Sequence, residues 1–280
     1  MRIFCAARTR NSEGIGMVKL FKAYIISNNE ILPNIHFMRV KVPEIAKTGI
    51  PGQYVMVRCG EGHDMPLRRP LGIHRIYKDG IALLFTVIGR GTEWLSQRKA
   101  GEQVDLFGPL GKGFEINSTS RNLLLVAGGV GVAPLIALAE KAIADGLSVK
   151  LLIGEKSSTK IYPEHLLPSG IKPVITTEDG SLGQKGMITD ILPQFIPEAD
   201  QIFACGPLSM YRAIAKMSSK FGGKPVYVLL ETVMGCGVGA CLSCSIETKH
   251  GRKLVCKNGP VFELSDILWD KIVAPPAGRR

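Results

Sequence analysis

A chain of 280 residues can bury more than one hydrophobic core, so we expect two domains and a small appendage. Hydrophobic residues make up 45 % and charged residues 21 %, which argues against disorder, and no apolar stretch approaches the roughly 18 residues of a membrane span. The net charge of +11 would suit nucleic acid, but the basic residues are scattered without a recognition motif, so we expect no nucleic-acid partner and no membrane contact.

The N-terminal residues 1–16 are predicted to be a disordered extension without function. Their apolar run, residues 3–7, is too short for the core of a signal peptide, so we expect a cytoplasmic protein. An odd count of seven cysteines in such a protein favours metal ligands or free thiols over a disulfide framework.

Residues 17–117 are predicted to form a small antiparallel β-barrel. Short β-rich runs separated by Gly, Pro and Asp follow one another without a long helical period: KAYIIS, HFMRVKV, QYVMVRC, LGIHRIY, IALLFTVIG and EQVDLFGPLG.

Residues 118–230 have a different pattern, in which apolar strands alternate with helices. NLLLVAGGVGVAPLIALAEKAIADG is a strand, a glycine turn and a helix, and strands at VKLLIGEK, KPVITTEDG, QIFACGP and VYVLLE follow, with helices at ITDILPQF and LSMYRAIAKMSSKFG. This alternation predicts a parallel sheet covered on both faces. The fold class is therefore a β-barrel plus an α/β domain, with residues 231–280 as a third, small domain.

The C-terminal segment carries four cysteines in the pattern Cys-x4-Cys-x2-Cys followed by a fourth: Cys236, Cys241, Cys244 and Cys256. The first part is the spacing of plant-type [2Fe–2S] sites, and the interleaved glycines allow the loop to wrap around a cluster. Structural zinc is the main alternative, although zinc ribbons usually pair two Cys-x2-Cys knuckles and only one is present. Four merely buried cysteines are a weaker alternative.

The barrel segment contains two candidate phosphate-binding motifs. Arg69 precedes a proline, which favours an extended backbone and projects the guanidinium as a fork suited to a pyrophosphate. Gly89, Gly91 and Thr92 lie at a predicted strand-to-helix turn, whose N–H groups could bind the same phosphates. Each motif alone is about equally compatible with a surface arginine or an ordinary turn.

The α/β segment contains two further candidates. Residues 127–134 form a glycine turn between a strand and a helix, in the right place for a dinucleotide, although the spacing differs from Gly-x-Gly-x-x-Gly and a structural turn is an alternative. Residues 205–207 end a strand at the edge where open α/β sheets bind ligands. The alternative for Cys205 is a buried small apolar residue, an interpretation that fits Cys5 and Cys59 better than any function. Glu155 favours a free ribose 2′-hydroxyl, whereas the neighbouring Lys156 and serines leave the choice between NAD and NADP open at this point.

RRPLGI, GRGT, GPLGKGF, GGVGVAPL and CGP, in this order, resemble the ferredoxin reductase family, an FAD-binding barrel followed by a nicotinamide-binding domain. With TTEDGSLGQKGMITDIL, MGCGVGACLSC and VCKNGPVF, the chain from about Met17 to Trp269 resembles the electron-transfer subunits of dihydroorotate dehydrogenase B. Where that family usually has a small hydroxyl residue in its flavin motif, this chain has Gly72.

The resemblance implies site residues for three cofactors. For FAD they are Arg69, Pro70, Leu71, Gly72, Leu84, Phe85, Thr86, Gly91 and Thr92; for NAD, Gly128, Gly129, Gly131, Pro134, Cys205, Gly206 and Pro207; for a [2Fe–2S] cluster, Cys236, Cys241, Cys244 and Cys256. No residue is expected to act as a general acid or base.

The resemblance also implies a function in pyrimidine (UMP) biosynthesis. Electrons from a separate FMN-containing dihydroorotate dehydrogenase catalytic subunit would pass through the cluster and FAD to NAD⁺, in a heterotetramer with two copies of each chain. Two alternatives stay open: a flavin subunit of a ferredoxin-linked NAD(P)H oxidoreductase or sulfide dehydrogenase, and a zinc-stapled nucleotide-binding module without turnover.

Overall fold

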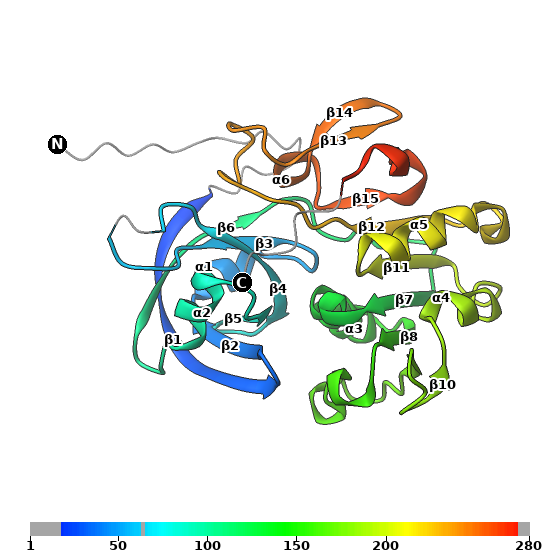
Figure 1. The fold of residues 1–280 in the computed structure, drawn as a ribbon, viewed down its shortest axis with the longest axis horizontal. Coiled ribbons are helices and arrows are strands. Elements are labelled where there is room, and N and C mark those ends of the chain that lie inside the picture. Colours follow the sequence, from blue (N-terminus) through cyan, green and yellow to red (C-terminus); the bar gives the residue numbers. More distant parts are fainter. Residues whose placement is uncertain (1–17, 63–64, 274–280) are drawn as a thin grey trace.

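The computed structural model describes residues 18–62 and 65–273; the predicted extension lies outside them. Six antiparallel strands close a barrel in the order β1-β2-β5-β4-β3-β6 (Figure 1). The barrel comprises β1 (Lys19–Leu32), β2 (Ile35–Lys41), β3 (Tyr54–Val57), β4 (Arg69–Ile76), β5 (Gly80–Thr86) and β6 (Gln103–Leu110), with the short helices α1 (Pro43–Thr48) and α2 (Arg90–Ser96). The predicted barrel is confirmed.

Alternating side chains explain why these strands form a closed barrel. On β1, Ala23 and Ile25 are buried in the barrel core while Tyr24 between them is exposed. This period of two places one face of each strand in a common interior. Cys59 lies fully buried in the same core, as expected for a small apolar residue.

A seven-stranded sheet follows the barrel, in the order β10-β9-β8-β7-β11-β12-β15. Its elements are β7 (Asn122–Gly128), α3 (Val132–Ala144), β8 (Ser148–Glu155), β9 (Val174–Thr177), β10 (Gln184–Lys185), α4 (Ile188–Ile191), β11 (Gln201–Cys205), α5 (Leu208–Lys216), β12 (Val226–Leu229) and β15 (Val261–Glu263). All pairs are parallel except β12 with β15, so the predicted parallel sheet is confirmed. The strand order reverses between β7 and β11, which is the switch point where such sheets bind ligands.

The C-terminal segment adds β13 (Ser245–Thr248), β14 (Gly251–Leu254) and α6 (Val255–Asn258) before β15 joins the sheet. Cys244 and Cys256 belong to a hydrophobic cluster that also contains Tyr54 and Met56 of the barrel and residues of the sheet. The segment therefore completes a core shared with both larger parts.

A buried histidine connects the barrel to the sheet domain. His74 of β4 is fully buried; its Nδ1 lies 2.7 Å from the carbonyl oxygen of Ala133 in α3, and its Nε2 lies 2.9 Å from the Tyr162 hydroxyl. Arg75 beside it forms an ion pair with Glu140 of α3 at 3.4 Å. These contacts fix the sheet domain against β4, the strand that begins with the predicted flavin motif.

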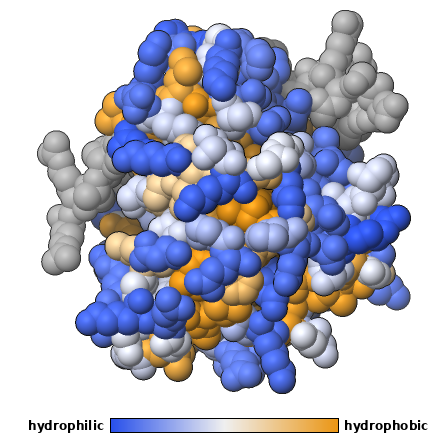
Figure 2. Space-filling view, turned by 90° about the vertical axis from the view of Figure 1, so that its right-hand side faces the viewer, coloured by the Kyte–Doolittle hydropathy of each residue, from blue (hydrophilic) through white to orange (hydrophobic). Residues whose placement is uncertain are grey.

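Across the described residues, no helix is long and apolar enough to cross a membrane. Figure 2 shows the face on the side of α5 and β10, where hydrophilic residues cover most of the surface and apolar residues are visible between them.

Candidate cofactor sites

The two predicted phosphate-binding motifs of the barrel lie in contact. A Cβ atom at Gly91 would lie 2.8 Å from Arg69 Nε, so only glycine allows the guanidinium to lie against the start of α2. Arg69 is the first residue of β4 and its Nη1 donates to the Leu67 carbonyl at 2.6 Å. The neighbouring Arg68 is held by Asp105 at 3.0 Å. Arg69 is therefore the arginine placed to bind an anion together with the α2 turn.

The Thr92 hydroxyl does not have the free donor that direct phosphate binding would need. It accepts hydrogen bonds from the N–H groups of Ile88 and Gly89 and donates to the Gly89 carbonyl at 3.0 Å. The residue thus caps and shapes the α2 turn. In this structure the backbone of the turn and Arg69 are the groups left for a phosphate.

The predicted flavin strand β5 divides its side chains between two faces. Phe85 packs in the barrel core and stacks on His36, with the ring centroids 5.5 Å apart, so its side chain supports the strand from inside the barrel. Leu84 faces the contact between barrel and sheet domain, and Thr86 is half-buried.

The flavin motif on β4 leaves open space at its fourth residue. Pro70 and Leu71 are half-buried in the strand, and a Cβ atom at Gly72 would meet no atom within 4 Å. The position can therefore accept a small side chain, although this chain presents bare backbone there.

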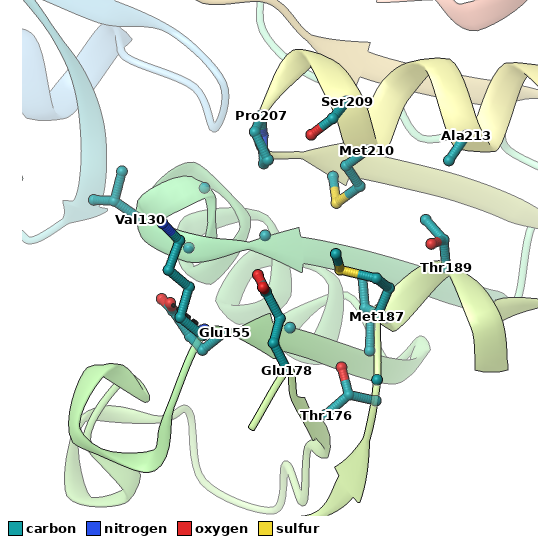
Figure 3. Close-up of a pocket in the computed structure, with 18 of the residues that line it drawn as sticks. Val130, Glu155, Thr176, Glu178, Met187, Thr189, Pro207, Ser209, Met210 and Ala213 are labelled. Atoms are coloured by element: carbon teal, nitrogen blue, oxygen red, sulfur yellow. Dashed lines mark hydrogen bonds between the residues drawn. The ribbon is translucent and has the colours of Figure 1, made fainter. Parts of the chain in front are cut away.

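The nucleotide motifs meet around a cavity of ≈ 500 Å³ at the switch point of the sheet (Figure 3). Gly128, Gly129 and Gly131 line it from the end of β7, and Gly206 and Pro207 line it from the end of β11. A Cβ atom at Gly131 would lie 2.2 Å from the Cys205 carbonyl oxygen, so glycine is required for this close approach. The size and position suit a dinucleotide.

Two predicted nucleotide residues do not line this cavity. Pro134 is buried in the first turn of α3, and the Cys205 side chain is buried in the sheet core, where burial raises its pKa. Their side chains pack the helix and the strand end, while the backbone of Cys205 lies against Gly131 at the cavity wall.

Three carboxylates line the cavity, of which the sequence drew attention to only one. Glu155 at the end of β8 and Glu178 after β9 rise from one side, opposite Pro207 and Met210 (Figure 3). Glu231 lies two residues after the end of β12 and lines the cavity, and desolvation by the surrounding protein raises the pKa of its carboxyl. The signal for Glu178 and Glu231 was their position just after predicted strands at the ligand-binding edge.

The cysteine loop directs backbone donors at a thiol. The N–H groups of Val238, Ala240 and Cys241 approach Cys236 Sγ at 3.3–3.5 Å, and the Cys256 N–H approaches Cys244 Sγ at 3.4 Å. Gly237 and Gly239 have φ of +75° and +81°, which glycine adopts without a Cβ clash and which turns the loop inward. These donors suit sulfur in the thiolate form.

The four cysteines contact one another in two pairs. The Cys241 N–H donates to Cys236 Sγ, and the Cys256 N–H donates to Cys244 Sγ. Hydrogen bonding, chiefly with Ser243, lowers the pKa of Cys241 to about 6, whereas burial raises the pKa of Cys256 to about 12. Within residues 18–62 and 65–273, no three His, Cys, Asp or Glu side chains are grouped so as to hold one metal ion.

The cysteine loop lies directly on the barrel strand that neighbours the flavin motif. The Tyr54 hydroxyl donates to the Cys256 carbonyl at 3.1 Å, and a Cβ atom at Gly237 would lie 2.9 Å from Met56 Cγ. On β4, Gly72 and Pro70 are the register partners of these two β3 residues. Neighbouring strands are about 4.8 Å apart, so the loop and the flavin motif lie one strand from each other.

Comparisons with known proteins identify relatives along nearly the whole chain. Residues 231–268 match the model of the iron-sulfur cluster binding domain of dihydroorotate dehydrogenase B. The dihydroorotate dehydrogenase B (NAD(+)) electron transfer subunit of Desulforamulus reducens is 37 % identical over 263 residues, covering 91 % of this chain and 100 % of that protein. The Bacillus cereus (strain Q1) subunit of the same name is 33 % identical, with 87 % and 96 % covered.

Solved structures agree with these relatives. A chain from the structure of an NADH-dependent reduced ferredoxin-NADP oxidoreductase has a TM-score of 0.80 and 28 % identity, covering 89 % of this chain and 90 % of that one. A ferredoxin NADP⁺ reductase from Neisseria gonorrhoeae has the same fold, with a TM-score of 0.60, 17 % identity, and 73 % and 92 % covered. The chain belongs to the family of dihydroorotate dehydrogenase B electron transfer subunits.

Proposed function

We propose that this chain is an oxidoreductase subunit that passes electrons from a dihydroorotate-oxidising subunit to NAD⁺ in pyrimidine biosynthesis. The observation that carries the proposal is the adjacency of three sites: the cysteine loop on β3, the flavin motif on β4, and the nucleotide cavity in the domain fixed to β4 through His74. Electron transfer needs such short separations, whereas a binding module does not. The relatives named above carry this function in their names.

The residues present fit the cofactors that the function requires. A [2Fe–2S] cluster, FAD and NAD would together supply one-electron transfer at one end and hydride transfer at the other. Two pairs of cysteines, each joined by a hydrogen bond from a backbone N–H to sulfur, suit two irons with two thiolates each, whereas a structural zinc ion needs four thiolates at one point. Arg69 and the α2 turn would hold the FAD pyrophosphate, and the β7 glycine turn would hold the NAD phosphates.

The charge of the nucleotide cavity supports NAD over NADP. Glu155 and Glu178 lie on the same wall, and a 2′-phosphate placed near them would be repelled. Lys156 is the only basic residue among the cavity-lining residues that the structure describes.

The rim of the cysteine loop supports docking of a partner. Cys241 is exposed, and Val233 and Leu242 beside it are 56 % and 55 % exposed. Leu242 has φ of +60°, a conformation that bulky residues rarely adopt, so the loop presents this apolar side chain despite backbone strain. We propose that an FMN-containing catalytic subunit covers this rim, in a complex with two copies of each chain.

The test is selective loss of electron transfer from the partner. Cys244→Ser in the full chain, assembled with a dihydroorotate-oxidising FMN subunit, is expected to abolish dihydroorotate-dependent NAD⁺ reduction while NADH still reduces FAD. Cys59→Ser is the matched control, because Cys59 is equally buried but lies in the barrel core. Equal loss of both activities in Cys244→Ser would show that the cysteine segment is only structural.

A second candidate function is a subunit of an NADH-dependent ferredoxin-NADP oxidoreductase, which the similarity to that solved structure favours. Reduction of NAD⁺ by ferredoxin, without any by dihydroorotate and its subunit, would support it. Colourless protein that contains zinc would instead support a zinc-stapled nucleotide-binding module.

A further inference from the structure

We propose that the Ser243 hydroxyl raises the reduction potential of the iron–sulfur cluster by donating a hydrogen bond to the Cys241 thiolate. The inference rests on the proposed function, because it assumes that the four cysteines hold such a cluster. It assigns to Ser243 a role in setting how readily the cluster accepts an electron.

The serine hydroxyl is held beside the sulfur. Ser243 Oγ lies 3.2 Å from Cys241 Sγ and accepts a hydrogen bond from the Gly235 N–H at 3.0 Å. The Val233 carbonyl is a second possible acceptor for the hydroxyl proton, but at a longer 3.4 Å. A metal-bound thiolate carries no proton, so the shared hydrogen between oxygen and sulfur must come from the serine.

Ser243 differs in kind from the other donors at this site. Cys236 and Cys244 receive hydrogen bonds from backbone N–H groups, which every residue except proline supplies. Of the side chains that the structure describes, Ser243 alone, apart from the cysteines, hydrogen-bonds to one of the four sulfurs. A substitution at this position can therefore remove the donor to sulfur, together with the acceptor of the Gly235 N–H, whereas Ser243→Thr keeps both.

The direction of the effect follows from charge. Reduction adds one negative charge to the cluster and its ligands, so a donor to sulfur stabilises the reduced form more than the oxidised form. Cys241 is the exposed ligand of the four, at the rim where the partner is proposed to dock. The hydroxyl thus acts on the side of the cluster that faces the incoming electron.

The experiment measures the midpoint potential of the cluster by a redox titration followed by electron paramagnetic resonance. In the full chain with its cofactors, Ser243→Ala is expected to lower the equilibrium constant for cluster reduction about tenfold, or about 59 mV for one electron. Ser243→Thr keeps a hydroxyl and should retain the wild-type potential. Ser245→Ala, an exposed serine at the start of β13, is the matched control and should leave it unchanged.

Each other outcome counts against the role of Ser243. An unchanged potential in Ser243→Ala would overturn it, and so would loss of iron and sulfide from this variant, because that would show a role in assembly. A wild-type chain without iron and sulfide would overturn both this inference and the proposed function. An intact cluster with an unmoved potential would overturn the inference alone.

Discussion

Replacement of Gly131 by alanine should weaken dinucleotide binding while leaving the flavin and cluster sites intact. The added Cβ would lie 2.2 Å from the Cys205 carbonyl oxygen and 2.8 Å from the Gly206 nitrogen. Both are backbone atoms of the opposite wall, so no side chain can rotate away. A normal carbon–oxygen contact requires the two walls to separate by roughly 1 Å.

The magnitude follows from the cost of overpacking. Inserting a methyl group into a close-packed site costs about 1–3 kcal/mol. The free protein can relieve this strain by opening the cavity, but the bound state needs both walls in place, so the cost falls on binding. This corresponds to a loss of roughly 5- to 150-fold in NADH affinity.

The assay is anaerobic titration with NADH, following flavin reduction, with flavin absorbance and iron content as checks on the other sites. Gly146→Ala is the matched control: Gly146 follows α3, has φ of +78°, and has no atom within 4 Å of its added Cβ. It should cost about 1 kcal/mol of folding stability and leave NADH affinity unchanged. Equal NADH affinities in the two variants would refute the assignment of the β7 turn to dinucleotide binding.

Two further predictions concern the flavin motif and the contact between barrel and sheet domain. Gly72→Ser should fold normally, because its side chain meets open space. It should tighten FAD binding about fivefold through one added hydrogen bond, measured by flavin fluorescence. Weaker FAD binding would show that the cofactor needs a residue without a side chain at this position. Burial lowers the pKa of His74 to about 4, so the unfolded state, with a pKa near 6.5, binds more protons between these values. As pH falls from about 6.5 to 4, wild-type protein should therefore lose up to about 3 kcal/mol of unfolding free energy, measured by urea denaturation. His74→Gln should be less stable than wild type at neutral pH, because the hydrogen bonds with Ala133 and Tyr162 are disturbed. Its unfolding free energy should fall less between pH 6.5 and 4. Parallel plots of unfolding free energy against pH for the two proteins would contradict the assignment of this pH dependence to His74.

The barrel and the parallel sheet could be predicted because both rest on local patterns. Short alternating runs bounded by turn residues define the barrel strands, and apolar runs alternating with helices define the sheet. The antiparallel pairing of β15 with β12 was not predictable in this way. This pairing joins strands on either side of the cysteine loop. It depends on tertiary packing, which produces no periodic pattern in the local sequence.

The sites were predictable as separate motifs but not as a set of contacts. In the sequence, Arg69 is as compatible with a surface arginine as with phosphate binding, and Gly91 is as compatible with an ordinary turn. Only the fold shows that the two residues lie against each other. The resemblance implies that the strand of Leu84, Phe85 and Thr86 approaches the flavin, but it does not indicate that the Phe85 side chain points into the barrel core. The sequence does not single out Ser243, because only the structure shows that the oxygen of this serine lies beside the sulfur of Cys241.

The short chain segment between the nucleotide cavity and the cysteine loop limits the distance between these two proposed sites. Glu231 lines the cavity, and Cys236, the first of the proposed cluster ligands, is five residues further along the chain. Five residues span at most about 18 Å even when fully extended, so the backbones at these two sites lie within that distance. The flavin motif is reached from the cysteine loop through β3 and β4, and the cavity domain is fixed to β4 through His74. The proposed flavin motif thus lies on barrel strands that contact the parts of the chain carrying both other sites. A carrier between a one-electron donor and a hydride acceptor requires such a central position.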